Sequence, residues 1–126
     1  MIYKNNQKLK FGSYIREQRI KKNFGQRELA EKIGIAASYL NDIEKEKRGA
    51  PKLNIIKKIS TLLNLNSDYL NDLAGLSKKS IAPDISEYIV NNPQLISLVR
   101  SIKNNNLSYD QILEIENSIN KNDTKA

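Results

Sequence analysis

Apolar residues recur at helical spacing along most of the chain, and their clearest pattern lies between residues 26 and 45. This stretch predicts two short helices, over residues 26–33 and 37–45, with Gly34 ending the first one because glycine tolerates a positive φ. The apolar positions are Leu29, Ala30 and Ile33 in the first helix, and Leu40 and Ile43 in the second. Helices this short are not stable alone, so the flanking segments must complete the core.

Three further helices are predicted around this pair, over residues 9–22, 52–63 and 67–75, after a frayed arm at residues 1–8. Ser67 is the expected N-cap of the last of these, and Gly75 is its expected end. The residues expected to face the core are Phe11, Ile15, Ile55, Ile56, Ile59, Leu62, Leu63, Leu70 and Leu73. Five short helices by residue 75 predict an all-α domain over residues 1–75.

The remainder of the chain reads as a linker, residues 76–83, followed by a helical region over residues 84–126 with a frayed end. Pro93 suits a helix start, and Ser108 with Gln111 is a capping-box pattern. The apolar stripes of this region are formed by Leu95, Leu98, Val99, Ile102, Ile112, Ile115 and Ile119. A region with so few helices cannot bury these apolar stripes by itself. We therefore expect a second copy of the chain to cover them. Packing against the first domain is the alternative.

Charge is distributed unevenly over the 126 residues, whose net charge is +7. Residues 1–79 hold 17 basic and 8 acidic residues, a net +9, whereas residues 80–126 hold 4 and 6, a net −2. A basic front half suits a polyanionic partner, although a solvated lysine surface explains the charge equally well.

The composition argues against an enzyme. The chain has no cysteine and no histidine, which removes thiolate ligands, the commonest nitrogen ligand and the commonest general base. No phosphate-binding glycine loop or hydrolase motif is present. The neighbouring carboxylates Glu28 with Glu31, and Glu44 with Glu46, are better explained as solvated or salt-bridged. We therefore expect no catalytic residue, metal or cofactor. Since no apolar run reaches the ~18 residues of a membrane span, and no signal peptide is recognisable, a cytoplasmic location is expected.

The helix over residues 37–45 presents polar side chains away from its apolar face, which suits a recognition helix in the major groove of DNA. Asn41 can bond adenine through two hydrogen bonds, Ser38 can bond a base or a phosphate, and Ala37 can touch a thymine methyl group. Asp42 either accepts from cytosine or holds a neighbouring basic side chain. Tyr39 either packs against the domain or contacts the DNA backbone.

Basic and amide side chains flank this helix on both sides. Gln26 begins the preceding helix, where its amide and backbone N–H can meet a phosphate. The complete set of candidate DNA contacts is Gln26, Arg27, Ala37, Ser38, Tyr39, Asn41, Asp42, Lys45, Lys47, Arg48 and Lys52. We expect the basic cluster after the recognition helix to grip the DNA backbone.

The stretch Gly12 to Gly75 resembles the XRE/lambda-repressor-like helix-turn-helix family. The matching residues are Gln26, Leu29, Ala30, Ile33, Gly34, Leu40, Ile43, Glu44, Pro51, Ile59, Leu62, Leu73, Ala74 and Gly75. The resemblance implies a five-helix domain that binds palindromic operators as a dimer, with an ion pair between Arg19 and Glu44. An arginine on the apolar stripe of the first helix needs such a partner in any case. Gly25 and Ala36 depart from the family's usual Ser or Thr caps.

A narrower resemblance is to SinR-type repressors, through the segment IAASYLNDIE and the tail, notably Leu98-Val99-Arg100, Ser108 and Gln111. It implies dimerisation through C-terminal helices and contact with a small protein antagonist. Phage and mobile-element immunity repressors share the architecture. The leading hypothesis is a dimeric repressor. The alternative is a DNA-binding antitoxin whose C-terminal helices bind a protein partner.

Overall fold

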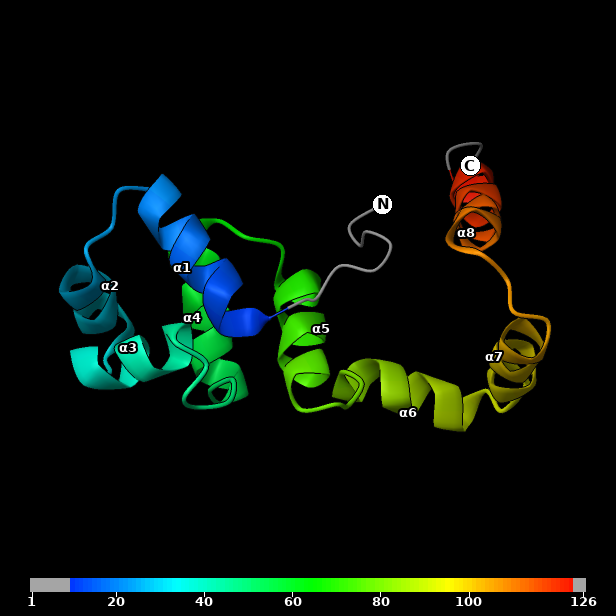
Figure 1. Ribbon diagram of the computed structural model, residues 1–126, viewed down its shortest axis with the longest axis horizontal. Helices are drawn as coiled ribbons and strands as arrows, with labels where there is room; N and C mark the ends of the chain where they lie inside the picture. The colour runs from blue at the N-terminus through cyan, green and yellow to red at the C-terminus, as the bar shows by residue number, and fades with distance from the viewer. Residues whose placement is uncertain (1–9, 124–126) are drawn as a thin grey trace. The chain divides into compact units, whose positions relative to one another are not determined.

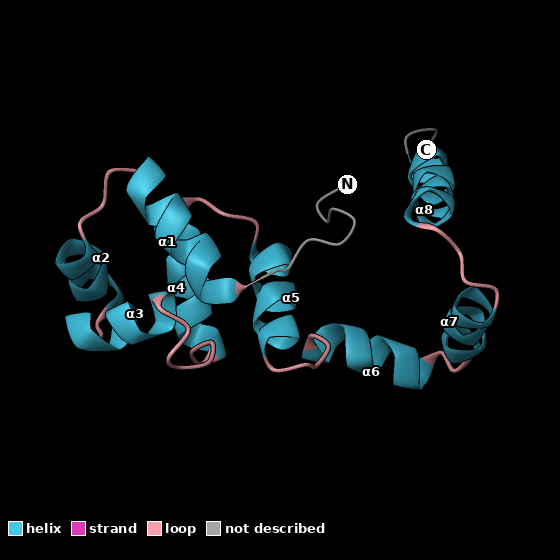
Figure 2. Cartoon of the chain, in the orientation of Figure 1, coloured by secondary structure: helices cyan, strands magenta, loops and turns pink. Residues whose placement is uncertain are grey.

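The computed structural model describes residues 10–123, with side chains placed up to residue 121. All regular structure in this range is helical, which confirms the predicted all-α class (Figure 2). The helices are α1 (Phe11–Lys21), α2 (Gln26–Ile33), α3 (Ala37–Glu44), α4 (Leu53–Leu63), α5 (Ser67–Ser77), α6 (Pro83–Asn91), α7 (Gln94–Asn104) and α8 (Tyr109–Asp123) (Figure 1). Leu9, the expected start of the first helix, and the arm before it lie outside the described residues, as does the end from residue 124.

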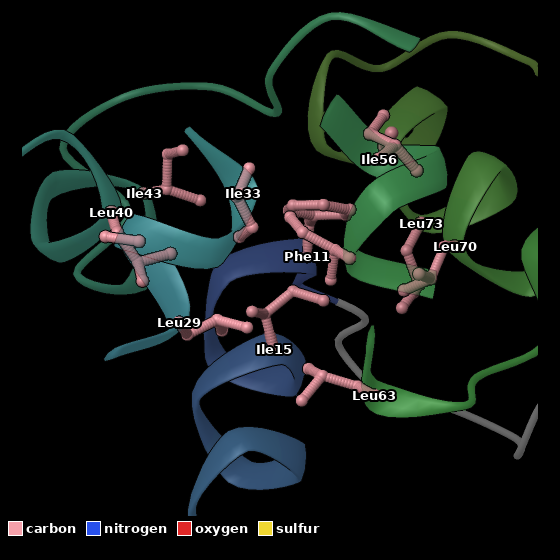
Figure 3. Packing of buried hydrophobic residues seen from close by; sticks show 13 residues of the cluster. Phe11, Ile15, Leu29, Ile33, Leu40, Ile43, Ile56, Leu63, Leu70 and Leu73 are labelled. Atoms are coloured by element: carbon pink, nitrogen blue, oxygen red, sulfur yellow. The ribbon is translucent and has the colours of Figure 1, made fainter. Parts of the chain in front are cut away.

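The chain divides into two compact units, with the boundary between Pro83 and Asp84. In the unit that contains α1 to α5, α1 packs against α3 and α5, and α4 packs against α2 and α5. The side chains between these helices form one apolar core, part of which is drawn in Figure 3. Its buried members are Phe11, Ile15, Leu29, Ala30, Ile33, Leu40, Ile43, Ile56, Ile59, Leu63, Leu70, Leu73 and Ala74. Ile55 and Leu62, which were expected in the core, are only half-buried at its edge.

The turn between α2 and α3 follows the sequence prediction. Gly34 adopts a left-handed conformation with φ of 91°, which glycine takes without a steric penalty. Its N–H and that of Ile35 both donate to the carbonyl of Ala30, at 2.9 and 3.0 Å, which closes the end of α2. Gly25 precedes α2 as its N-cap, and its N–H donates to Glu28 Oε1 at 3.3 Å. Glycine has no side chain to return this bond, so only half of a capping box forms.

α5 begins at Ser67 as predicted, but its N-cap and its end differ from the prediction. The N-cap is Asn66 rather than Ser67, because Asn66 Oδ1 accepts from the N–H of Tyr69 at 2.8 Å. The helix also continues through Gly75 to Ser77, and the carbonyl of Gly75 accepts from the N–H groups of Lys78 and Ser80 at 3.0 and 2.8 Å. The segment without regular structure is therefore limited to residues 78–82.

The N-terminus of α1 is held by residues distant in sequence. The N-cap Lys10 provides no side-chain hydrogen bond, but Ser77 Oγ accepts from the N–H of Phe11 at 3.3 Å. Glu46 Oε1 accepts from the N–H of Ser13 at 2.9 Å. A carboxylate at this position also complements the positive end of the helix dipole. The loop after α3 and the end of α5 thus fix where α1 begins.

The unit that follows Pro83 contains α6, α7 and α8, in which α6 and α7 have no buried residue. The predicted capping box is present at α8: the N–H of Ser108 donates to Gln111 Oε1 at 2.8 Å, and the N–H of Gln111 donates to Ser108 Oγ at 3.2 Å. α7 begins at Gln94, so Pro93 is the N-cap of this helix and not its first helical residue as predicted from the Asn92-Pro93 pair. Proline is tolerated there because its missing N–H removes no hydrogen bond of the helix.

Candidate nucleic-acid interface

The second helix of the pair, α3, is anchored by its apolar face and leaves its other face accessible. Leu40 and Ile43 are buried, with exposed fractions of 0% and 1%. Ser38 is exposed, and Asn41 and Asp42 are half-buried. No side chain caps the N-terminus of α3 at Ala36, so the N–H groups of its first turn have no cap from their own segment.

The carboxylate of Glu44, at the end of α3, is held in a buried ion pair. Arg19 Nε lies 2.8 Å from Glu44 Oε2, and Arg19 Nη2 lies 3.0 Å from Glu44 Oε1. The two side chains are 11% and 1% exposed. Arg19 Nη1 also donates to the carbonyl of Phe24 at 2.8 Å. A two-point pair of this kind fixes the carboxylate in orientation as well as in position, so the end of α3 is locked to α1.

Gln26 of α2 joins this ion pair to Asn41, which lies one turn before Glu44 in α3. Its Nε2 donates to Glu44 Oε1 at 3.2 Å and to Asn41 Oδ1 at 3.3 Å. The amide of Gln26, which we expected to meet a phosphate, is thus engaged within the domain. The periodicity of the sequence did not suggest this contact, since Gln26 and Asn41 are 15 residues apart and on different helices.

Asp42 and Tyr39 lie next to Arg48 in the loop that follows α3. Arg48 Nε is 4.0 Å from Asp42 Oδ2, and the Arg48 guanidinium carbon is 5.5 Å from the centre of the Tyr39 ring. The carbonyl of Asp42 also accepts from the N–H groups of Lys47 and Arg48, at 2.9 and 3.2 Å. Of the two roles considered for Asp42, the structure therefore shows the contact with a neighbouring basic side chain. Tyr39 is half-buried against the core and carries Arg48 on its ring.

All eleven candidate DNA contacts are at least partly accessible at the surface of this unit. The exposed ones are Arg27, Ser38, Lys45, Lys47, Arg48 and Lys52, and the half-buried ones are Gln26, Ala37, Tyr39, Asn41 and Asp42. Four of the six exposed residues are basic side chains within residues 45–52, the segment between α3 and α4. A run of positive charge beside an accessible helix face is suited to an anionic backbone.

Gly12 and Glu46 shape this site and were not anticipated from the sequence. A Cβ atom on Gly12 would lie 1.9 Å from the carbonyl oxygen of Ile43, so only glycine allows α1 to approach the end of α3 this closely. Glu46 has a positive φ of 62° and an exposed side chain, and its carboxylate also caps α1. The sequence suggested a solvated or salt-bridged carboxylate but not this cap. The signal available in the sequence was the glycine itself, placed one residue after a core phenylalanine at a helix start.

The C-terminal unit has an exposed apolar surface. Of the seven side chains expected to mediate oligomerisation, five are exposed, by 38% to 58%: Leu98, Val99, Ile112, Ile115 and Ile119. Leu95 and Ile102 are half-buried. Tyr88 and Val90 of α6 are also exposed, by 60% and 72%. Apolar exposure on this scale is typical of surfaces through which proteins associate.

Two other kinds of site are absent from the part of the chain that the structure describes. No helix between residues 10 and 123 has both the length and the apolar content that crossing a bilayer requires. Within the same range there is no cluster of three or more potential metal-binding side chains.

Residues 15–70 match the family model described as helix-turn-helix. This segment is an XRE-type helix-turn-helix domain. Among curated proteins, the transcriptional regulator SinR of Bacillus subtilis is 36% identical over 61 residues, which are 48% of this chain and 55% of SinR. The regulator ImmR of the same bacterium is 33% identical over 72 residues, or 57% of this chain and 56% of ImmR. The chain thus spans about half the length of these relatives.

Solved structures also resemble parts of this chain. SinR in complex with DNA is 35% identical over 48% of this chain and 95% of that one, with a TM-score of 0.45. A complex of SinR with SinI is 24% identical over 90% of this chain and 98% of that one, with a TM-score of 0.49.

Proposed function

We propose that this protein is a sequence-specific DNA-binding transcriptional regulator that acts as a repressor. The observation that carries the proposal is the geometry of α3: its apolar face is buried, its end is locked by Arg19 and Glu44, and exposed basic residues follow it directly. The relatives SinR and ImmR are both named as transcriptional regulators. The helix-turn-helix family comprises DNA-binding regulators and not enzymes. A bacterial regulator that binds chromosomal DNA acts in the cytoplasm, so the proposal includes a cytoplasmic location.

The proposal assigns different roles to two groups of side chains at the candidate DNA interface. Ser38, Asn41 and Ala37 read base edges, whereas Arg27 and the basic residues 45–52 bind phosphates. Repression follows if the bound protein occludes the promoter. Two copies related by a two-fold axis would place two α3 helices in successive major grooves, about 34 Å apart. A palindromic operator follows from that symmetry.

Selection from a randomised DNA library with the full chain tests this proposal. We expect enrichment of a sequence with two inverted half-sites, and a bound site upstream of regulated genes when binding is mapped across the genome. Transcription from such a promoter should fall when the protein is added. Binding that is equally tight to all sequences would contradict sequence-specific recognition, and transcription that rises would contradict repression.

We further propose that α7 and α8 mediate self-association, which leaves a small protein antagonist as a competitor for the same apolar surface. Leu98→Asp introduces a charge on the exposed stripe of α7, and Arg100→Asp on the same helix is the matched control. Light scattering should report a dimer or larger assembly for the wild type and for the control, and a smaller mass for Leu98→Asp. An unchanged mass for Leu98→Asp would argue against this surface as the self-association site.

The exposed apolar surface of the C-terminal unit also suits a different protein, which is the antitoxin alternative. In that case the purified chain would be monomeric by light scattering. It would form a stoichiometric complex when co-expressed with the product of an adjacent gene. A dimer that does not change on such co-expression would argue against the antitoxin role.

A further inference from the structure

Three carboxylates lie between residues 37 and 52, and two of them are engaged by α1. Glu44 is buried against Arg19, and Glu46 accepts a hydrogen bond from the backbone at the start of α1. Asp42 is the third, and its carboxylate lies beside the exposed side chain of Arg48. A carboxylate on a DNA-facing helix repels phosphates, so the contact with Arg48 determines what Asp42 contributes to binding.

The side chain of Arg48 is held from two directions. Its Nε is 4.0 Å from Asp42 Oδ2, and its guanidinium carbon is 5.5 Å from the centre of the Tyr39 ring, which packs against the core. The N–H of Arg48 also donates to the carbonyl of Asp42 at 3.2 Å, so the backbone of the loop is tied to the same turn of α3. A carboxylate near Nε and a ring over one face leave the edge formed by the two Nη groups for another anion.

We propose that Asp42 and Tyr39 hold the Arg48 guanidinium in place for a DNA phosphate, which the two Nη groups bind. This inference rests on the proposed DNA-binding function. An exposed ion pair at this distance adds little stability by itself, but it limits the conformations that the arginine samples. A side chain that is ordered before binding avoids part of the entropy loss that binding otherwise requires. Asp42 and Tyr39 are positioning residues, because they act on the phosphate only through Arg48.

The proposal predicts an effect of Asp42 that is opposite in sign to that of its charge alone. If the carboxylate only repelled phosphates, its removal would strengthen DNA binding. If Asp42 positions Arg48, Asp42→Ala should instead weaken binding to all sequences alike, by about threefold. In an Arg48→Ala background there is no guanidinium to position, so Asp42→Ala should leave the affinity unchanged or raise it.

Affinities of the full chain for a sequence selected from a randomised library and for an unrelated duplex, measured by fluorescence anisotropy at several salt concentrations, test the proposal. Arg48→Ala should weaken binding to both duplexes by about five- to tenfold at roughly 0.1 M salt, and should reduce the slope of log affinity against log salt by about 1. Lys47→Ala, next to Arg48 and exposed, is the matched control. Its loss should weaken binding by the same factor with and without the Asp42 carboxylate.

A second pair of variants keeps the test decisive if Asp42→Ala does not fold, which its circular dichroism spectrum would show. Tyr39→Phe keeps the ring beneath the guanidinium, whereas Tyr39→Leu removes it and keeps an apolar side chain against the core. Tyr39→Leu should therefore bind both duplexes about threefold more weakly than Tyr39→Phe. Equal binding by these two variants would contradict the role of the ring.

An Asp42→Ala affinity equal to or above that of the wild type would overturn the inference while the proposed function stands. So would a loss of affinity that is the same with and without Arg48, since it would not act through the guanidinium. Loss of a base preference in Arg48→Ala would show a contact with a base in place of the phosphate. A wild type that binds both duplexes equally would instead refute sequence-specific recognition, although the coupling of Asp42 with Arg48 can be measured on either duplex.

Discussion

Replacing Gly12 with alanine should destabilise the protein, although the same change inside a helix normally stabilises it. A glycine-to-alanine change in a helix gains about 1 kcal/mol of helix propensity. At Gly12, however, the new Cβ would lie 1.9 Å from the carbonyl oxygen of Ile43 and 2.8 Å from Glu46 Oε1. Real Cβ contacts are not shorter than 3.0 Å, so α1 and α3 must separate by about 1 Å. The obstructing atom belongs to the backbone and cannot rotate away.

The size of the effect follows from what that separation disturbs. Overpacking of a core costs about 1–3 kcal/mol, and loss of the hydrogen bond from Ser13 N–H to Glu46 costs about 1 kcal/mol more. After subtracting the gain in propensity, we expect Gly12→Ala to lower the free energy of unfolding by about 1–3 kcal/mol. For a domain of this size that corresponds to a fall in Tm of roughly 5–20 °C.

Thermal and urea unfolding followed by circular dichroism measure this directly. Gly49→Ala is the matched control, because the nearest atom to its added Cβ is Lys78 Cε at 3.8 Å, an ordinary contact. That variant should be as stable as the wild type or slightly more stable, by up to about 1 kcal/mol. If Gly12→Ala also matched or exceeded the wild type, the close approach of α1 to the end of α3 would be refuted.

Three further predictions concern the buried ion pair, the basic loop after α3 and the pair of tyrosines on α1 and α5. Arg19→Ala should lower the free energy of unfolding by about 3–5 kcal/mol in urea titration, because it leaves the buried carboxylate of Glu44 without its partner; an unchanged midpoint would contradict this. Lys47→Ala should weaken binding to all DNA sequences alike and reduce the slope of log affinity against log salt by about 1, whereas an altered base preference would argue against a phosphate contact. Burial raises the pKa of Tyr14, with Tyr69 adding to the effect, and burial also raises the pKa of Tyr69. The protonated tyrosines thus stabilise the fold up to about pH 10, and this contribution is lost as the pH rises through their folded-state pKa values. Replacing both Tyr14 and Tyr69 with phenylalanine should therefore flatten the fall in the free energy of unfolding above about pH 10, measured by urea titration. An unchanged pH profile would refute this.

Short-range signals predicted the core and most helices of the first unit. The bounds of α2 agree with the prediction because Gly25 and Gly34 mark both of its ends through backbone conformation alone. The start of α5 at Ser67 also agrees, but its N-cap is Asn66. Asn66 and Ser67 are both residues that cap helices well, and only the bond to the N–H of Tyr69 decides between them. The helix ends at Ser77, two residues beyond the prediction, which took Gly75 as the end because glycine often follows the last helical residue. In the structure Gly75 is helical, and its carbonyl accepts hydrogen bonds from the turn that follows.

The parts of the site that could not be predicted all join helices that are distant in the sequence. Helical periodicity tells which face of α3 is buried, but not which atom of Gln26 faces Asn41. That depends on how α2 crosses α3 and on where α1 holds the carboxylate of Glu44. The close approach at Gly12 sets this last position, because it brings α1 against the end of α3.

If α3 reads bases as proposed, stability and base recognition share one carboxylate in this domain. Glu44 neutralises the buried charge of Arg19 and, through Oε1, also sets the direction of the Gln26 amide. Loss of Arg19 should thus reduce both the free energy of unfolding and the base discrimination at the position that Asn41 is proposed to read. Loss of Lys47 should reduce neither, because an exposed side chain in the loop lies outside this chain of bonds. Comparing the two variants therefore distinguishes a contact that fixes the orientation of side chains on α3 from a contact that only adds affinity for DNA.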